Sequence, residues 1–180
     1  MKTKIRPANP ADVPGLFHIR TSVRENHLNR EQLASLGITE ASIAEMISTA
    51  PCAWVAVSGD KVVGFSMIDI AEGSLFAAFV LPSHEGMGIG AKLVDAAENE
   101  LFRHHSEIWL ETAENSRAAG FYRHLGWSNE IKVEDDQIRL TKAPLMSSAG
   151  RRMGSPMGAH ASSPIAAVVH IPAESRQPQY

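Results

Sequence analysis

The chain has 180 residues, 44% of them hydrophobic, and a formal net charge of −3 at pH 7. This length favours one well-buried domain, and the slight negative charge without a basic block argues against a nucleic-acid partner. The amino terminus lacks an apolar core, which excludes a signal peptide, and no apolar run approaches the roughly 20 residues of a membrane span. The single cysteine, Cys52, excludes an intramolecular disulfide and favours a cytoplasmic protein.

The first half of the chain predicts short strands and short helices. Strands are indicated by β-branched residues and helices by apolar residues at helical spacing after a capping residue. In chain order these are a strand over 2–7, a helix with Asn9 as its N-cap, two helical pieces around 31–36 and 40–49 counted as one segment, and strands over 53–57 and 61–70.

The second half continues with one long helix between strands. The elements are strands over 75–81 and 108–112, helices over 88–104 and 116–125, and strands over 130–133 and 137–141. The resulting order, βααβββαβαββ, predicts an α/β fold with a mixed sheet and helices on both of its sides.

Composition changes abruptly after Lys142. Of the 38 residues from 143 to 180, 21 are Ala, Gly, Ser or Pro, without sustained periodicity. Such a stretch buries too little apolar surface to offset its chain entropy. We therefore expect a folded domain over 1–142 and a disordered or loosely docked tail over 143–180, in which 165–171 has the composition of a strand that adds to a sheet edge.

The segment 79–90 combines a strand, a loop with three alternating glycines and the start of a helix. Glycine has no Cβ, so Gly86, Gly88 and Gly90 allow phosphate groups to approach the backbone closely. The helix directs its free N–H groups and the positive end of its dipole into the same space. This arrangement predicts an anion site, suited to a pyrophosphate.

A dinucleotide-binding fold is one source of such a site. Residues 86–91 satisfy G-x-G-x-x-A, and Glu111 follows roughly 20 residues later, where a ribose-binding acid would stand. However, that fold requires repeated βαβ units, whereas hairpins join the strands in the first half of this chain. The loop over 82–85 is also longer than the tight turn of that motif.

A second motif runs from Trp109 to Trp127. The glycine loop after a strand, followed by a strand, Asn115, the pair Phe121-Tyr122 and Leu-Gly-aromatic, resembles the GCN5-related N-acetyltransferase (GNAT) superfamily. The resemblance covers 1–142. It implies a GNAT-like acyl-CoA N-acyltransferase fold, acetyl-CoA as cosubstrate, and direct transfer of the acetyl group to an amine in a ternary complex.

The resemblance also implies how CoA is bound. Backbone N–H groups of the loop and helix start would hold the pyrophosphate, and the free edge of the preceding strand would pair with the pantetheine arm. Asn115 would bond the pantetheine, or would instead cap the next helix. The implied cofactor-binding residues are Phe79, Val80, Leu81, Gly86, Met87, Gly88, Ile89, Gly90, Ala91, Lys92 and Asn115.

Glu85 departs from the family pattern. The family usually has Gln or Arg at this position, and a carboxylate beside a diphosphate is unfavourable. We therefore expect Glu85 to point to solvent or to Lys92, and the phosphate site to be built from backbone.

The resemblance assigns catalytic roles as well. Tyr122 matches the tyrosine that protonates the departing CoA thiolate as general acid; its alternative role is packing on the apolar face of its helix. Glu111 is the candidate general base, with Glu72, Glu25 and His27 as alternatives. The family shapes its acceptor site between the first helices, which here contain Glu25, Asn26 and His27.

The acceptor itself stays open between a small-molecule amine and a peptide amine, and a homodimer is compatible with the resemblance. A non-catalytic acyl-CoA-binding module is the alternative to an enzyme. His104 and His105 point about 100° apart on a helix and do not easily bind one ion, so we expect no metal.

Overall fold

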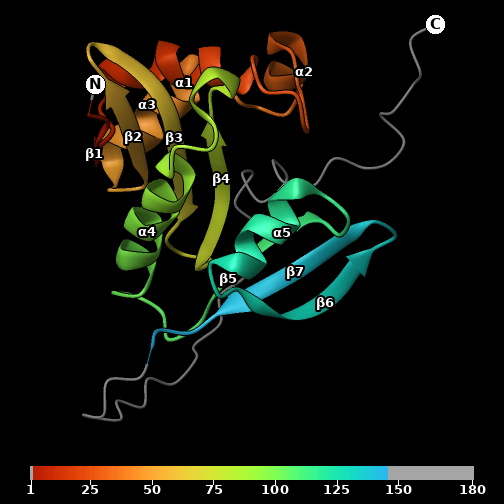
Figure 1. Ribbon diagram of the computed structural model, residues 1–180. Helices are drawn as coiled ribbons and strands as arrows, with labels where there is room; N and C mark the ends of the chain where they lie inside the picture. The colour runs from red at the N-terminus through yellow and green to blue at the C-terminus, as the bar shows by residue number, and fades with distance from the viewer. Residues whose placement is uncertain (1, 146–180) are drawn as a thin grey trace, which may run out of the picture.

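The computed structural model describes residues 2–145, which form one seven-stranded sheet with the order β1-β2-β3-β4-β5-β7-β6 (Figure 1). The predicted α/β architecture is confirmed. Most of the predicted tail, including 165–171, lies outside the described residues. In chain order the elements are β1 (Lys4–Pro7), α1 (Val13–Arg20), α2 (Arg30–Ser35), α3 (Glu40–Thr49), β2 (Ala53–Ser58), β3 (Lys61–Asp69), β4 (Ser74–Val80), α4 (Ile89–Leu101), β5 (Ile108–Ala113), α5 (Arg117–His124), β6 (Ser128–Glu134) and β7 (Gln137–Lys142).

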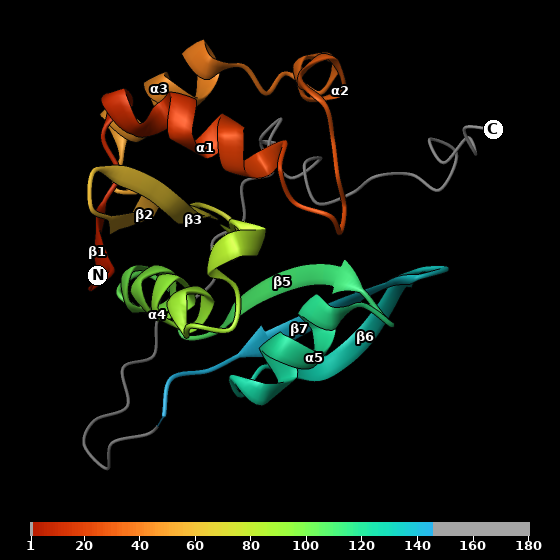
Figure 2. The same cartoon turned by 45° about the horizontal axis from the view of Figure 1, so that its top comes forward.

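Helices cover both faces of the sheet formed by β1 to β4. Figure 2 shows α1 and α3 above β2 and β3, with α4 below them. Alternation along β3 produces these two faces. Ser66 donates a hydrogen bond to the carbonyl of Leu93 on α4, whereas the neighbouring Phe65 and Met67 line a cavity beneath α1 and α3.

Two predicted helix ends differ from the structure. Asn9 caps a 3-10 turn over Pro10–Asp12, and α1 begins only after that turn. The helix predicted over 88–104 ends at Leu101, because the amides of 103 and 104 bond carbonyls three residues back. Beyond it, His104 contacts Glu100 and His105 contacts the carbonyl of Ile70, so the two rings have separate partners.

A buried ion pair joins α4 to the C-terminal strands. Glu98 is 8% exposed and accepts hydrogen bonds from the Trp127 indole at 2.8 Å and from the Lys142 ammonium at 2.7 and 2.9 Å. Lys142 also donates to the carbonyl of Leu125. One carboxylate thus connects α4, the end of α5 and β7.

Candidate functional site

The sheet divides between β4 and β5. These two strands are parallel and pair at a single position, Ser74 with Trp109. The Trp109 amide donates to the Gly73 carbonyl and its indole to the Glu72 carbonyl, so the strands are joined at their N-terminal ends. Toward Val80 and Ala113 the described strands have no pairing with each other, which leaves a free edge on β4. Glu72, an alternative base, lies at the joined end.

Backbone direction decides which residues offer hydrogen bonds at the free edge. The Leu81 amide donates to the Val63 carbonyl on β3, so the amide and carbonyl of Val80 point away from β3. By the same alternation Ala78 faces the free edge and Phe79 faces β3. Ala78 therefore shares the free edge with Val80, although it is not among the residues that the motif predicted, and the predicted Phe79 and Leu81 face β3.

A bulge on β4 lies one residue before this edge. Met67 pairs with Ala77 and Ile68 with Leu75, which leaves Phe76 as the extra residue. Bulges bend a strand and are over-represented beside active sites. No local sequence signal marks Phe76, because a bulge is defined by the partner strand.

The glycine loop leads directly from this edge into α4. Gly86 and Gly88 have φ angles of +73° and +75°, in the left-handed region that favours glycine, and a Cβ at either would meet no atom within 4 Å. Gly88 is the N-cap of α4 and provides no side-chain cap. The Lys92 amide bonds the Gly88 carbonyl, so the free amides of the first turn belong to residues 88–91.

The remaining loop residues differ in exposure. Met87 is 61% exposed, whereas Ile89 is buried in the core. A Cβ on Gly90 would lie 3.3 Å from the Phe121 ring, so the absence of a side chain lets α4 approach α5 closely. Ala91 and Lys92 belong to the first turn, with Lys92 exposed.

Glu85 has a partner that the sequence analysis did not anticipate. Its Oε2 lies 3.2 Å from Nη2 of Arg117, in the first turn of α5, and both side chains are exposed. Glu85 is thus exposed to solvent, as one of the two expectations had it, but its ion-pair partner is Arg117 and not Lys92. Arg117 neutralises the carboxylate beside the loop and brings a cation to the place where the family pattern has Gln or Arg on the loop itself.

Asn115 lies just before α5, and Tyr122 lies on the inner face of that helix. The helix is capped by Ser116, whose hydroxyl accepts from the Ala119 amide, so Asn115 is not the N-cap. Asn115 is exposed, and its side chain bonds no other described residue. Tyr122 is 9% exposed and packs edge-on against Phe121 and Trp127. Burial raises the pKa of its phenol.

Glu111 is held by an arginine on the neighbouring strand. Its Oε1 accepts from Nε of Arg139 at 3.0 Å and from Nη2 at 2.6 Å, and the guanidinium lies 4.0 Å from the centre of the Trp109 ring. Glu111 and Arg139 are register partners on β5 and β7. This ion pair depends on strand pairing, which spacing in the sequence does not reveal.

A cavity of about 350 Å³ lies on the face of β3 and β4 opposite α4. Most of its lining is aliphatic or aromatic, and Phe79 of β4 is one wall. The other lining residues are Leu16, Phe17 and Arg20 of α1, Leu33, Leu36, Gly37 and Ile38, Ser42, Ile43, Glu45, Met46 and Thr49 of α3, and Phe65, Met67, Phe76 and Ala77 of the sheet.

The predicted acceptor segment lies beside this cavity. Glu25, Asn26 and His27 are exposed in the loop between α1 and α2, and Asn26 has a φ of +56°. The Asn26 carbonyl accepts a 2.7 Å hydrogen bond from Nη1 of Arg20, which ties the loop to the cavity wall. Arg20 itself was missed, although a charged residue four positions after Leu16 breaks the apolar stripe and is a signal the sequence contains.

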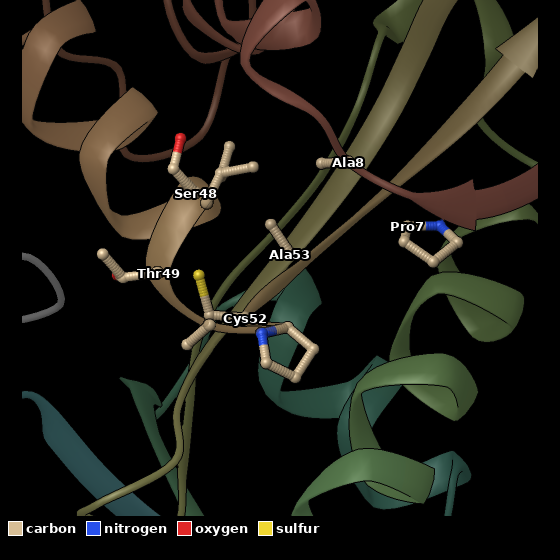
Figure 3. A pocket seen from close by; sticks show the side chains of 9 residues that line it. Pro7, Ala8, Ser48, Thr49, Cys52 and Ala53 are labelled. Atoms are coloured by element: carbon tan, nitrogen blue, oxygen red, sulfur yellow. The ribbon is translucent and has the colours of Figure 1, made fainter.

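A second hollow, of about 300 Å³, lies where α3 leads into β2 (Figure 3). Cys52 lines it beside Thr49 and Ala53, and its lining contains no charged side chain. Burial raises the pKa of the Cys52 thiol, so the thiol stays protonated and packs as a small apolar group.

The described part of the chain holds no cluster of three or more His, Cys, Asp or Glu side chains able to bind a metal ion. Within the same residues, every helix is too short or too polar to cross a membrane.

Comparisons with known proteins agree with this geometry. A sequence model described as "Acetyltransferase (GNAT) family" matches residues 16–127. No curated protein matches the sequence.

Solved structures show the same fold. PaiA N-acetyltransferase from Thermoplasma acidophilum, in complex with coenzyme A, superposes with a TM-score of 0.67 at 16% identity, over 80% of this chain and 100% of that one. Ribosomal-protein-alanine N-acetyltransferase from Brucella melitensis gives 0.62 at 20% identity, over 78% and 99%. Ribosomal-protein-S18-alanine N-acetyltransferase from Escherichia coli gives 0.59 at 20% identity, over 86% and 100%.

Proposed function

The chain belongs to the acetyltransferase (GNAT) family, and on that premise we propose that it transfers the acetyl group of acetyl-CoA directly to an amine in a ternary complex. The observation that carries this proposal is the parting of β4 from β5 beside the glycine loop. It leaves Val80 and Ala78 with free backbone groups and places the free amides of 88–91 at the end of the same strand.

The chain's own residues supply binding and positioning. The amides of the first turn of α4 would hold the pyrophosphate, and Arg117 offsets the negative charge of Glu85 in the same loop. The free edge of β4 would pair with the pantetheine arm, and a backbone amide there would polarise the thioester carbonyl as an oxyanion hole does. The free side-chain amide of Asn115 would add a hydrogen bond from the opposite side.

Tyr122 and Glu111 are the proposed acid and base. The buried phenol of Tyr122 would protonate the departing thiolate. Both bonds from Arg139 end on Oε1 of Glu111, so Oε2 is the atom that would take the amine proton, directly or through water. The same ion pair is the observation that favours a non-catalytic acyl-CoA-binding module, because a carboxylate engaged with Arg139 is less available as a base.

The test is release of CoA thiol from acetyl-CoA, measured with a panel of small amines and N-terminal peptides. The proposal expects thiol release that depends on the amine, with one acetylated product per thiol. Acetyl-CoA binding without thiol release for any amine would establish the binding module instead.

Three further features are part of the proposal. The catalytic domain covers 1–142, supported by the end of β7 at Lys142, and limited proteolysis should leave a core that ends close to this residue.

The protein works in the cytoplasm, consistent with its free, buried Cys52, and cell fractionation checks this. Sedimentation of the purified chain will distinguish a homodimer from a monomer.

A further inference from the structure

Arg20 is a buried cation without an anionic partner. Its residue is 6% exposed at the end of α1, and Nη2 is buried with no hydrogen-bond partner. Nη1 donates to the Asn26 carbonyl, and the guanidinium lies 4.7 Å from the centre of the Phe79 ring. None of the ion pairs among the described residues includes Arg20.

Without a ligand, this buried and unpaired guanidinium lowers the stability of the folded protein. Burial lowers the pKa of Arg20 to about 10, so the guanidinium remains charged at neutral pH. A buried charge is ordinarily paired, and a buried N–H without an acceptor loses its hydration with nothing in return. An anionic group that binds Nη2 would remove this cost.

The residues around Arg20 restrict the kind of molecule that could carry this anionic group. Arg20 is the one cation among the residues that line the 350 Å³ cavity, and Glu45, exposed on α3, is the one carboxylate. The rest of the wall is dominated by Leu, Ile, Met and Phe side chains. The cavity therefore suits a small molecule with one negative group and an apolar body. Polyamines and other cations would bind this cavity poorly, because the positive charge of Arg20 would repel them.

Phe79 connects this cavity to the chemistry of the proposed site. Its ring contacts the Arg20 guanidinium, while its neighbours Ala78 and Val80 present the free edge of β4. A carboxylate on Arg20 thus lies next to the strand where the thioester would be held. In an α-amino acid the amine is separated from the carboxylate by a single carbon, so the amine would be directed toward that strand.

We propose that the acceptor is a free α-amino acid with an apolar side chain, whose carboxylate binds Arg20 and whose side chain fills the cavity beneath α1 and α3. This inference rests on the proposed acetyl transfer. The α-ammonium group first releases one proton to solvent, because a protonated amine is not a nucleophile. The neutral nitrogen then forms a bond to the acetyl carbon and loses a second proton to the base, while the carbon–sulfur bond breaks and the thiolate takes a proton from Tyr122. The products are CoA thiol and an N-acetylamino acid, and proton exchange with solvent returns the base and Tyr122 to their starting states.

The first test compares acids with their amides. Thiol release is measured with leucine, methionine and phenylalanine and with the carboxamide of each, alongside spermidine and a peptide with N-terminal alanine. The carboxamide keeps the amine and side chain but lacks the charge, and its amine is less protonated at neutral pH, which by itself favours the carboxamide. We expect kcat/KM for the best acid to exceed that of its carboxamide by about 100-fold.

The second test removes the guanidinium. Arg20→Met should lower kcat/KM for the best acid by about 100-fold, mainly through KM, and leave its carboxamide within about threefold. Arg103→Met, an exposed arginine at the end of α4, is the matched control and should change neither. The best acid should raise the thermal stability of the wild type and not that of Arg20→Met.

Each opposite result overturns the inference. The inference is wrong if the wild type uses acid and carboxamide equally, or if it prefers the peptide or spermidine. These two outcomes need only the wild type, so they remain decisive even if Arg20→Met fails to fold. An equal loss with acid and carboxamide in the variant shows that Arg20 serves structure. In those cases acetyl transfer itself stands, whereas absence of thiol release with every amine, with or without acetyl-CoA binding, overturns the proposed function.

Discussion

At the residue scale, burial keeps the phenol of Tyr122 protonated, which a general acid requires before it acts, although the raised pKa also makes the phenol a weaker acid. Its phenol pKa lies above the ordinary value of about 10, so it keeps its proton through neutral and moderately alkaline pH. We expect Tyr122→Phe to lower kcat about 100-fold with unchanged acetyl-CoA affinity, measured by thiol release and direct binding. Wild-type turnover should show no loss near pH 10 from ionisation of this phenol. Equal kcat in both proteins would remove Tyr122 from the acid role.

The same raised pKa has a consequence for stability. The unfolded phenol ionises near pH 10, whereas the folded one resists ionisation to higher pH. The stability that this group contributes is therefore complete below pH 10 and is lost as the pH rises toward the folded value. The free energy of unfolding of the wild type, measured in urea, should therefore fall above pH 10. It should fall less for Tyr122→Phe.

Glu111 allows a test against a residue in a similar ion pair. Oε2 of Glu130 on β6 also accepts a hydrogen bond from an arginine, Nη2 of Arg123, at 2.7 Å. Glu130 lies away from the divided edge of β5. Glu111→Gln should lower kcat about 100-fold, while Glu130→Gln keeps the wild-type kcat. If the two variants behave alike, Glu111 serves the sheet, and Glu25 and His27 become the candidates.

At the element scale, the buried pair of Glu98 and Lys142 holds α4 against β7. Removing Lys142 leaves a buried carboxylate with Trp127 as its remaining donor. We expect Lys142→Met to lower the free energy of unfolding by about 3–5 kcal/mol in urea titrations. Lys132→Met is the control, because Lys132 pairs with Glu114 at an exposed position and its loss should cost below about 1 kcal/mol. Similar losses for the two lysines would contradict a special role for the buried pair.

The start of α4 supplies a second prediction at this scale. Gly88→Ala and Gly59→Ala both place a methyl group at positive φ, of +75° and +61°, and should each cost about 1–2 kcal/mol of stability. Gly88 lies at the proposed phosphate site, whereas Gly59 is exposed in the turn between β2 and β3. We expect the Kd for CoA, measured by calorimetry, to rise about tenfold for Gly88→Ala alone. An equal Kd in both variants would place the phosphates elsewhere.

At the scale of the whole molecule, the proposed ligand lies between the two parts of a divided sheet. A molecule that contacts β4, α4 and α5 together binds the folded chain and not the unfolded one. At 100 times its Kd, acetyl-CoA should stabilise the protein by about 2.7 kcal/mol, and CoA should act similarly. NAD and ATP are the comparison ligands in the same thermal-shift series. Stronger stabilisation by NAD would restore the dinucleotide interpretation of the glycine loop.

Local signals in the sequence determined the elements of this protein and the family it resembles. Glycines at 86 and 88 and the alternating pattern of the strands act over a few residues, so their order predicts the sheet and the loop that leads into α4. Helix ends were less certain, as α4 shows, because the last turn depends on what packs against it.

Only the tertiary structure decided which side chains meet. Arg117 pairs with Glu85, 32 positions away, and Arg139 holds Glu111, 28 positions away, each through a partner on another element. Burial of Arg20 against Phe79 of β4 follows the same rule. Hydrogen bonds and ion pairs act over about 3 Å, and folding brings together residues far apart in the chain. Spacing therefore predicts the glycine loop, whereas packing decides the cavity that we propose for the acceptor.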